Sequence, residues 1–194
     1  MSSAYSLKLE FSQAALTALN SASEKVCVVW LTFKPFPHNT IDWAEAYGIY
    51  ASSTSVQHGA TINRLSTLKA VSKTHQYPFN ESGFFDGPNQ THVKSYGLIN
   101  NYNEPLTFGL TQTAMVNGHQ VDSELNAVTV LHNQSAEFTP IVTLSVYVAA
   151  SFNNGSVISD ISSNTLVLTY TSDTHKNIYY DDVQNCFVEG NLPL

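Results

Sequence analysis

The sequence predicts an all-β protein, an antiparallel β-sandwich of jelly-roll type with one short helix near the N-terminus. Apolar and polar residues alternate with period two through much of the chain, most clearly within residues 138–171, which places one side of each strand against a core. Asn117-Gly118 and Asn154-Gly155 are dipeptides typical of hairpin turns. Eight or more short strands with few helices predict two packed sheets, and a closed barrel is the alternative.

The chain has the size of one domain. Its 194 residues are 43% hydrophobic, which is enough to bury a full core. Neither an internal repeat nor a linker interrupts it. We therefore expect a single domain that spans residues 1–194.

The first elements follow from local patterns. Tyr5 to Phe11 alternates apolar and polar side chains, as a half-buried strand does. Ser12 can cap a helix, and the alanines and leucines that follow it favour a helix as far as Ser23. Lys25 to Phe33 is almost continuously apolar and predicts one central strand covered on both faces.

The middle and the end of the chain are also predicted to be mostly strands. Apolar residues at every third position from Ile62 to Val71 permit a helix or a strand. Residues 75–90 are rich in turn-forming residues and predict a loop. The other predicted strands are 93–99, 106–116, 121–132, 138–150, 157–170 and 177–188.

Charge excludes one class of function. Only 12% of the residues are charged and the formal net charge is −7, so the chain lacks the basic stripe that a nucleic-acid-binding protein needs. Ser, Thr and Asn supply 57 residues instead. Such a surface suits neutral polar ligands such as sugars, although Ser/Thr-rich sandwiches without any ligand have the same composition.

The N-terminus has neither the basic stretch nor the apolar core of a secretory signal. Nowhere does an apolar run reach the roughly 18 residues of a membrane span. We expect a soluble protein that is cytoplasmic, or secreted without a conventional signal peptide.

The two cysteines are Cys27, in a predicted strand, and Cys186, in the last apolar stretch. Two buried free thiols are expected, with a bridge between first and last strands as the alternative. Neither belongs to a Cys-x-x-Cys pair, so a zinc site is unsupported.

Motifs for metals, cofactors and catalysis are absent from the sequence. No two of the seven histidines have the spacing of a metal pair. Asp86 and Asp181-Asp182 could offer oxygen atoms to calcium but match no EF-hand loop. Phosphate, dinucleotide and serine-hydrolase motifs are missing, so we expect no metal and no cofactor. Asp42 and Glu45 are the nearest candidates in the sequence for the pair of carboxylates that glycoside hydrolysis requires. Strand spacing places them on opposite faces, which weakens this interpretation.

Aromatic residues give the strongest functional signal. Tyrosine and tryptophan rings stack on sugars while amides and carboxylates bind the hydroxyls, so rings near Asn and Asp favour lectin-like recognition of neutral glycans. The candidate ligand-binding residues are Trp43, Tyr47, Asp86, Asn89, Tyr102 and Asn103. The alternative is that such rings fill the core, which we favour for Trp30, Phe33 and Trp43.

Three further hypotheses remain open. The alternating hairpin in 138–171 could make a membrane-active or lipid-binding protein. A cavity lined by tyrosine and histidine could make an enzyme or cyclase. Low surface charge and apolar strands favour a homodimer.

The pattern as a whole resembles that of small leaderless β-sandwich lectins and cytolysins, although no motif places the chain in one of those families.

Overall fold

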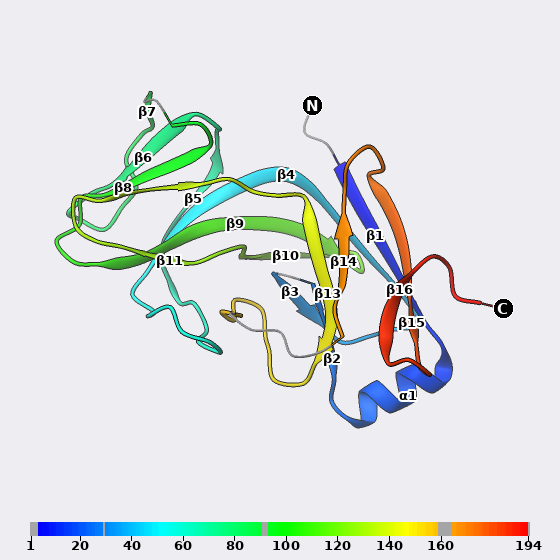
Figure 1. Ribbon diagram of the computed structural model, residues 1–194. Helices are drawn as coiled ribbons and strands as arrows, with labels where there is room; N and C mark the ends of the chain where they lie inside the picture. The colour runs from blue at the N-terminus through cyan, green and yellow to red at the C-terminus, as the bar shows by residue number, and fades with distance from the viewer. Residues whose placement is uncertain (1–3, 29, 91–92, 159–163, 194) are drawn as a thin grey trace.

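The computed structural model describes residues 4–28, 30–90, 93–158 and 164–193 and has the predicted all-β sandwich architecture with one short helix (Figure 1). The N-terminal elements are β1 (Ala4–Phe11), α1 (Gln13–Ser21), β2 (Lys25–Val28), β3 (Leu31–Phe33), β4 (His38–Ser52), β5 (Arg64–Val71), β6 (His75–Phe79) and β7 (Asn89–Gln90). The C-terminal elements are β8 (Tyr96–Asn100), β9 (Leu106–Val116), β10 (His119–Glu124), β11 (Val128–Val130), β12 (Ser135–Phe138), β13 (Thr143–Ala149), β14 (Leu166–Thr169), β15 (His175–Asp181) and β16 (Cys186–Glu189).

One large sheet forms the body of the molecule. Its strand order is β10-β9-β4-β1-β15-β16, with β5 paired to β4 and β11 paired to β9. The long strands β4 and β9 run along most of its length (Figure 1). In the described residues the path of this sheet begins and ends on different strands, so it does not close into a barrel.

Two smaller sheets pack against different ends of the large sheet, and each encloses its own core. The sheet β14-β13-β2-β3 lies near α1, and the sheet β12-β8-β6-β7 lies at the other end (Figure 1). The first core contains, among others, Leu7, Leu9, Val26, Ile41, Val146 and Ile178. The second contains Ile49, Phe79, Leu98, Phe108 and Leu110. Both cores include residues of β4 and β9, which therefore connect them.

The predictions of a first strand and of the helix that follows it are confirmed. β1 alternates as expected, with Tyr5, Leu7, Leu9 and Phe11 buried. The Ser12 side chain caps α1 by accepting a hydrogen bond of 3.0 Å from the Ala15 amide. Leu16 and Leu19 turn toward the first core, which fixes the helix on the end of the sandwich.

Several element predictions were wrong. The single strand predicted from Lys25 to Phe33 is instead two short strands, β2 and β3, that pair with each other, because the chain reverses between them without a glycine or proline to signal it. The predicted loop 75–90 contains β6 and β7. Residues 121–132 and 177–188 each contain two strands rather than one.

The two predicted hairpin turns differ in outcome. Asn117 and Gly118 have φ values of 50° and 80° and join β9 to β10, as an Asn-Gly hairpin should. Asn154-Gly155 forms a turn within the long connection from β13 to β14 instead of joining paired strands directly. Of the predicted strand 157–170, only β14 is a strand, and residues 159–163 lie outside the described residues.

The two cysteines are free. Cys27 is buried in β2 and Cys186 is half-buried in β16, and these strands belong to different sheets. Burial raises the pKa of the Cys27 thiol to about 12, with the nearby Glu24 charge acting in the same direction. Cys27 is therefore a small core residue rather than a reactive thiol.

Among the helical residues that the structure describes, we find no segment with both the length and the apolar character needed to cross a bilayer.

Candidate functional site

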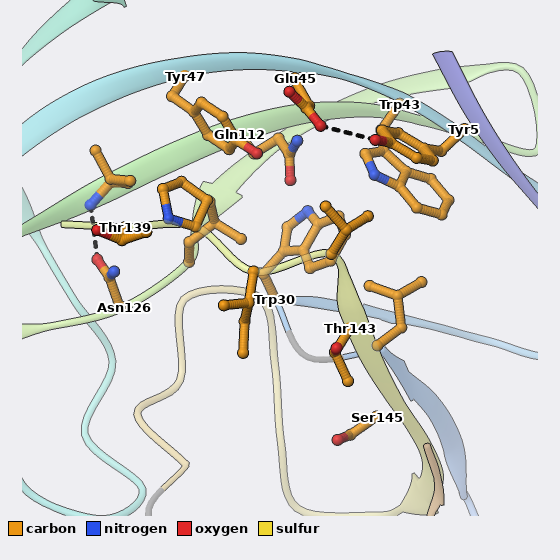
Figure 2. Close-up of a pocket in the computed structure, with 16 residues that line it drawn as sticks. Tyr5, Trp30, Trp43, Glu45, Tyr47, Gln112, Asn126, Thr139, Thr143 and Ser145 are labelled. Carbon is orange, nitrogen blue, oxygen red and sulfur yellow. Dashed lines mark hydrogen bonds between the residues drawn. The ribbon is translucent and has the colours of Figure 1, made fainter. Parts of the chain in front are cut away.

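One cavity lies where the two cores meet, and it has a volume of about 370 Å³. β4 and β9 form one wall, and the segment 139–145, which runs from β12 into β13, forms the other (Figure 2). The side chains that carry the site are Tyr5, Trp30, Trp43, Glu45, Tyr47, Gln112, Thr143 and Ser145.

A bulge in β4 shapes the first wall. Trp43 pairs with Ala114 of β9, but Tyr47 pairs with Gln112, so β4 uses two more residues than β9 over this stretch. The Gln112 side-chain nitrogen Nε2 donates a 2.8 Å hydrogen bond to the Ala44 carbonyl and holds the bulge. Bulges bend a strand and redirect its side chains. Here Glu45 projects into the cavity between the rings of Trp43 and Tyr47 (Figure 2).

Aromatic rings line one end of the cavity. Trp43 stacks on Tyr5 with ring centroids 5.6 Å apart, and Trp30 and Trp43 form a T-shaped pair with ring centroids 5.9 Å apart. The Tyr5 hydroxyl donates a 2.7 Å hydrogen bond to Glu45 Oε1, which fixes the carboxylate beside the rings (Figure 2). These contacts hold rings and carboxylate in a defined arrangement.

Two buried polar groups face the cavity. The Trp30 side chain is 95% buried, since its exposed fraction is 5%, yet its indole Nε1 has no hydrogen-bond partner among the described residues. Gln112 uses one of its two N–H donors for the Ala44 carbonyl, and among the described residues no hydrogen bond to its side-chain oxygen is found. Figure 2 shows this oxygen and the Trp30 nitrogen pointing into the same part of the cavity.

Burial raises the pKa of Tyr47 well above its ordinary value near 10, and the Glu45 carboxylate adds to the effect because it opposes a second negative charge. Tyr47 therefore stays protonated at neutral pH. Its hydroxyl, which points toward Gln112 in Figure 2, is a neutral hydrogen-bonding group.

Asn126 supports the wall that β4 and β9 form. Its side-chain oxygen accepts a 2.8 Å hydrogen bond from the Leu110 amide, and its carbonyl accepts one of 2.7 Å from the Tyr50 hydroxyl. Gly109 is required here, because a Cβ atom at this position would lie 2.0 Å from the Asn126 carbonyl oxygen. The shape of this side of the cavity thus depends on a close backbone approach.

The structure separates the six residues predicted to bind a ligand. Trp43 and Tyr47 line the cavity. Asp86 lies in the loop between β6 and β7 and accepts a 2.7 Å hydrogen bond from the Asn80 side chain. Asn89 begins β7, and Tyr102 and Asn103 lie in the turn between β8 and β9. These four residues are in the part of the molecule built on the second core and do not line the cavity.

Sequence reasoning missed Trp30 and Gln112 as site residues and gave Glu45 only as one of a carboxylate pair. Asp42, the other acid of that pair, is exposed, while Glu45 lines the cavity. The bulge that positions Glu45 has no signature in the sequence, because it contains no glycine. Trp30 was predicted to be a core residue, which its burial confirms, but it also lines the cavity.

Within the residues that the structure describes, no three His, Cys, Asp or Glu side chains are grouped so that they could hold a metal ion. Asp181 instead stabilises the turn that follows β15, where its Oδ1 accepts hydrogen bonds from the Val183 and Gln184 amides.

Comparison of the chain with protein-family models, with curated proteins and with solved structures finds no match in any of the three.

Proposed function

We propose that this protein is a non-enzymatic, lectin-like binding module that takes one residue of a glycan into the cavity between its two cores. The observation that carries the proposal is that Trp30 Nε1, a buried donor without a hydrogen-bond partner among the described residues, lines the same aromatic cavity as acceptors on Gln112 and Glu45. A sugar offers what this arrangement lacks, because each hydroxyl both donates and accepts hydrogen bonds.

The size and lining of the cavity support a small ligand. A volume of about 370 Å³ lies near the lower end of the roughly 300–1,000 Å³ range of small-molecule sites. Trp30, Trp43 and Tyr47 provide apolar surface for the C–H face of a pyranose, as rings do in polar ligand sites. Thr143 and Ser145 add hydroxyl groups on the opposite wall.

The hydrogen-bonding groups define how a hydroxyl would bind. A hydroxyl placed between Trp30 and Gln112 accepts from Nε1 and donates to the Gln112 oxygen. Leaving a buried N–H without a partner costs about 1–3 kcal/mol, so a ligand that supplies the acceptor recovers this energy. The gain is available only to ligands with polar groups, which favours a sugar over an apolar molecule of the same size.

The raised pKa of Tyr47 does not suit general-base catalysis by this residue. A general base works best when its pKa lies near the working pH. The raised pKa of Tyr47 moves its hydroxyl away from that condition and keeps it a neutral donor. We therefore place the enzyme or cyclase hypothesis below the binding proposal.

A glycan array with the wild-type protein and two variants tests the proposal. Trp30→Phe keeps an aromatic ring but removes the Nε1 donor, so we expect binding to weaken by roughly tenfold, the size of one lost hydrogen bond to a buried group. Asn103→Ala is the control, because Asn103 is exposed in the β8–β9 turn. It should bind as the wild type does.

Two results would count against this proposal. Loss of binding in Asn103→Ala with normal binding in Trp30→Phe would move the ligand to the predicted loop residues. A blank array for the wild type, supported by calorimetry, would remove the lectin-like function altogether.

The membrane-active function and the homodimer remain predictions. Dye release from liposomes of varied composition would establish the first. A mass measured by light scattering would decide the second, since a monomer has a mass of 21.3 kDa.

A further inference from the structure

We infer that the sugar residue bound in the cavity carries a protonated primary amine, which Glu45 recognises as an ion pair. This inference rests on the proposed glycan function and specifies which sugars the cavity selects. It follows from the charge of the cavity, from the rings around that charge and from the hydrogen bonds that the carboxylate already makes.

Glu45 gives the cavity a negative charge that no side chain of the described lining residues balances. Of the described residues that line the cavity, it is the only one with a carboxyl group, and none of them is Lys, Arg or His. The ion pairs found in the described part of the chain involve Glu10, Asp122, Glu124 and Glu189. A partly buried carboxylate without a counter-ion is unfavourable, so a cationic ligand is preferred to a neutral one of the same shape.

The rings beside Glu45 add to this preference. Tyr5 and Trp43 are stacked next to the carboxylate, and Tyr47 follows two residues later on the same strand. The negative face of an aromatic ring attracts cations, and tryptophan does so most strongly. Rings and carboxylate therefore favour the same charge at the same end of the cavity.

The hydrogen bonds of Glu45 favour a primary amine over a quaternary one. Oε1 accepts the hydrogen bond from the Tyr5 hydroxyl, and among the described residues no hydrogen bond to Oε2 is found. A primary ammonium group has three N–H donors and can bond to Oε2 directly, whereas a quaternary ammonium group has none. The nearby Trp30 and Gln112 groups remain available for hydroxyls of the same sugar ring.

The test compares three monosaccharides that differ at one carbon, D-glucosamine, N-acetyl-D-glucosamine and D-glucose, by NMR titration of the full chain at about pH 6, where the amine is protonated. A charge-assisted hydrogen bond contributes about 1.5–3 kcal/mol, so D-glucosamine should bind roughly tenfold more tightly than D-glucose or more. The N-acetyl sugar has no charge and should not share this advantage.

Glu45→Gln is the decisive variant. Glutamine has nearly the same shape and can still accept the Tyr5 hydrogen bond, so the fold should be kept. The variant loses only the charge-assisted contact. Its affinity for D-glucosamine should therefore exceed its affinity for D-glucose by less than about threefold. Its affinity for D-glucose should stay within about threefold of the wild-type value. Asp42→Asn is the matched control, because it removes one negative charge from an exposed position on the same strand.

The outcomes separate the two proposals. Equal binding of D-glucose and D-glucosamine, both lost in Trp30→Phe, would overturn the amine inference and leave the glycan function standing. A loss of preference in Asp42→Asn as large as in Glu45→Gln would assign the effect to overall charge and overturn the inference. Equally tight binding of tetramethylammonium would overturn the choice of a primary amine. A protein that binds no sugar on the array or by NMR would remove both proposals.

Discussion

Two groups of aromatic residues that look alike in the sequence occupy different physical settings in the molecule. Trp43 and Tyr47 are buried where the two cores meet, and they face a cavity with polar groups on its walls. Phe84 and Tyr102 lie in the region built on the second core. Phe84 has an exposed fraction of 65%, and Tyr102 packs against Phe79 with ring centroids 6.0 Å apart. One group forms an enclosed site and the other belongs to loops and turns.

A ring near Asn or Asp in the sequence is therefore not evidence for a shared site. Trp43 and Tyr47 face the cavity because a strand bulge and the neighbouring sheet place them there. Asp86 and Asn103 come from connections of the other end of the sandwich. The comparison can be tested by substitutions that are matched between the two regions.

The largest effect is expected from removing the central ring. Trp43→Ala should lower the free energy of unfolding by about 3–5 kcal/mol, because the ring packs against Tyr5, Tyr170 and Trp30. Phe84→Ala removes an exposed ring and should change it by no more than about 0.5 kcal/mol. Urea unfolding followed by circular dichroism measures both. Equal effects would mean that the cavity region is no better packed than the loop.

Two glycines give a smaller contrast. Gly109→Ala should cost about 1–3 kcal/mol, because the added Cβ would collide with the Asn126 backbone behind the cavity wall. Gly87 lies in the loop before β7 with no atom within 4 Å of an added Cβ, so Gly87→Ala should be neutral or slightly stabilising. Thermal unfolding of both variants checks this pair, and a neutral Gly109→Ala would show that Asn126 can move.

High pH should weaken the fold through its buried tyrosines. Burial raises the pKa values of Tyr47, Tyr50, Tyr147 and Tyr170 above 10, so above that pH the folded state keeps protons that the unfolded chain has lost. The free energy of unfolding is then fully maintained below pH 10 and falls as pH rises toward the folded pKa. The expected slope is about 1.4 kcal/mol per pH unit for each such tyrosine.

Urea unfolding between about pH 8 and pH 11 measures this slope. Tyr50→Phe, which removes one titrating hydroxyl, should have a smaller slope above pH 10 than the wild type. A stability that does not change across this range would contradict the burial of these hydroxyls.

The sequence was sufficient for the fold class because period-two alternation depends on one residue and its immediate neighbours. β1, α1 and β9 could be placed in this way. The reversal between β2 and β3 could not be placed, since it occurs within a continuous apolar run. β2 is held in position by pairing with β13 on one side and with β3 on the other. Local propensity does not record such tertiary constraints.

The candidate site was only partly predictable for the same reason. Trp43 and Tyr47 were identified from aromatic density in one strand. Trp30, Gln112 and Glu45 meet them only after two sheets pack together, and the bulge in β4 depends on a side-chain hydrogen bond from β9. A single sequence gives the residue types of such a site but not their meeting point.

The most direct measurement uses the fact that the chain has only two tryptophans, Trp30 and Trp43, both of which line the cavity. Their two indole N–H signals in a ¹⁵N–¹H NMR spectrum report on two residues of the cavity lining, and Trp30→Phe assigns them. Titration with D-glucosamine and with D-glucose should shift the Trp30 indole signal saturably, because its free N–H gains an acceptor. Unmoved indole signals, with saturable shifts confined to the backbone amides of residues 86–89 and 102–103, would contradict binding in the cavity.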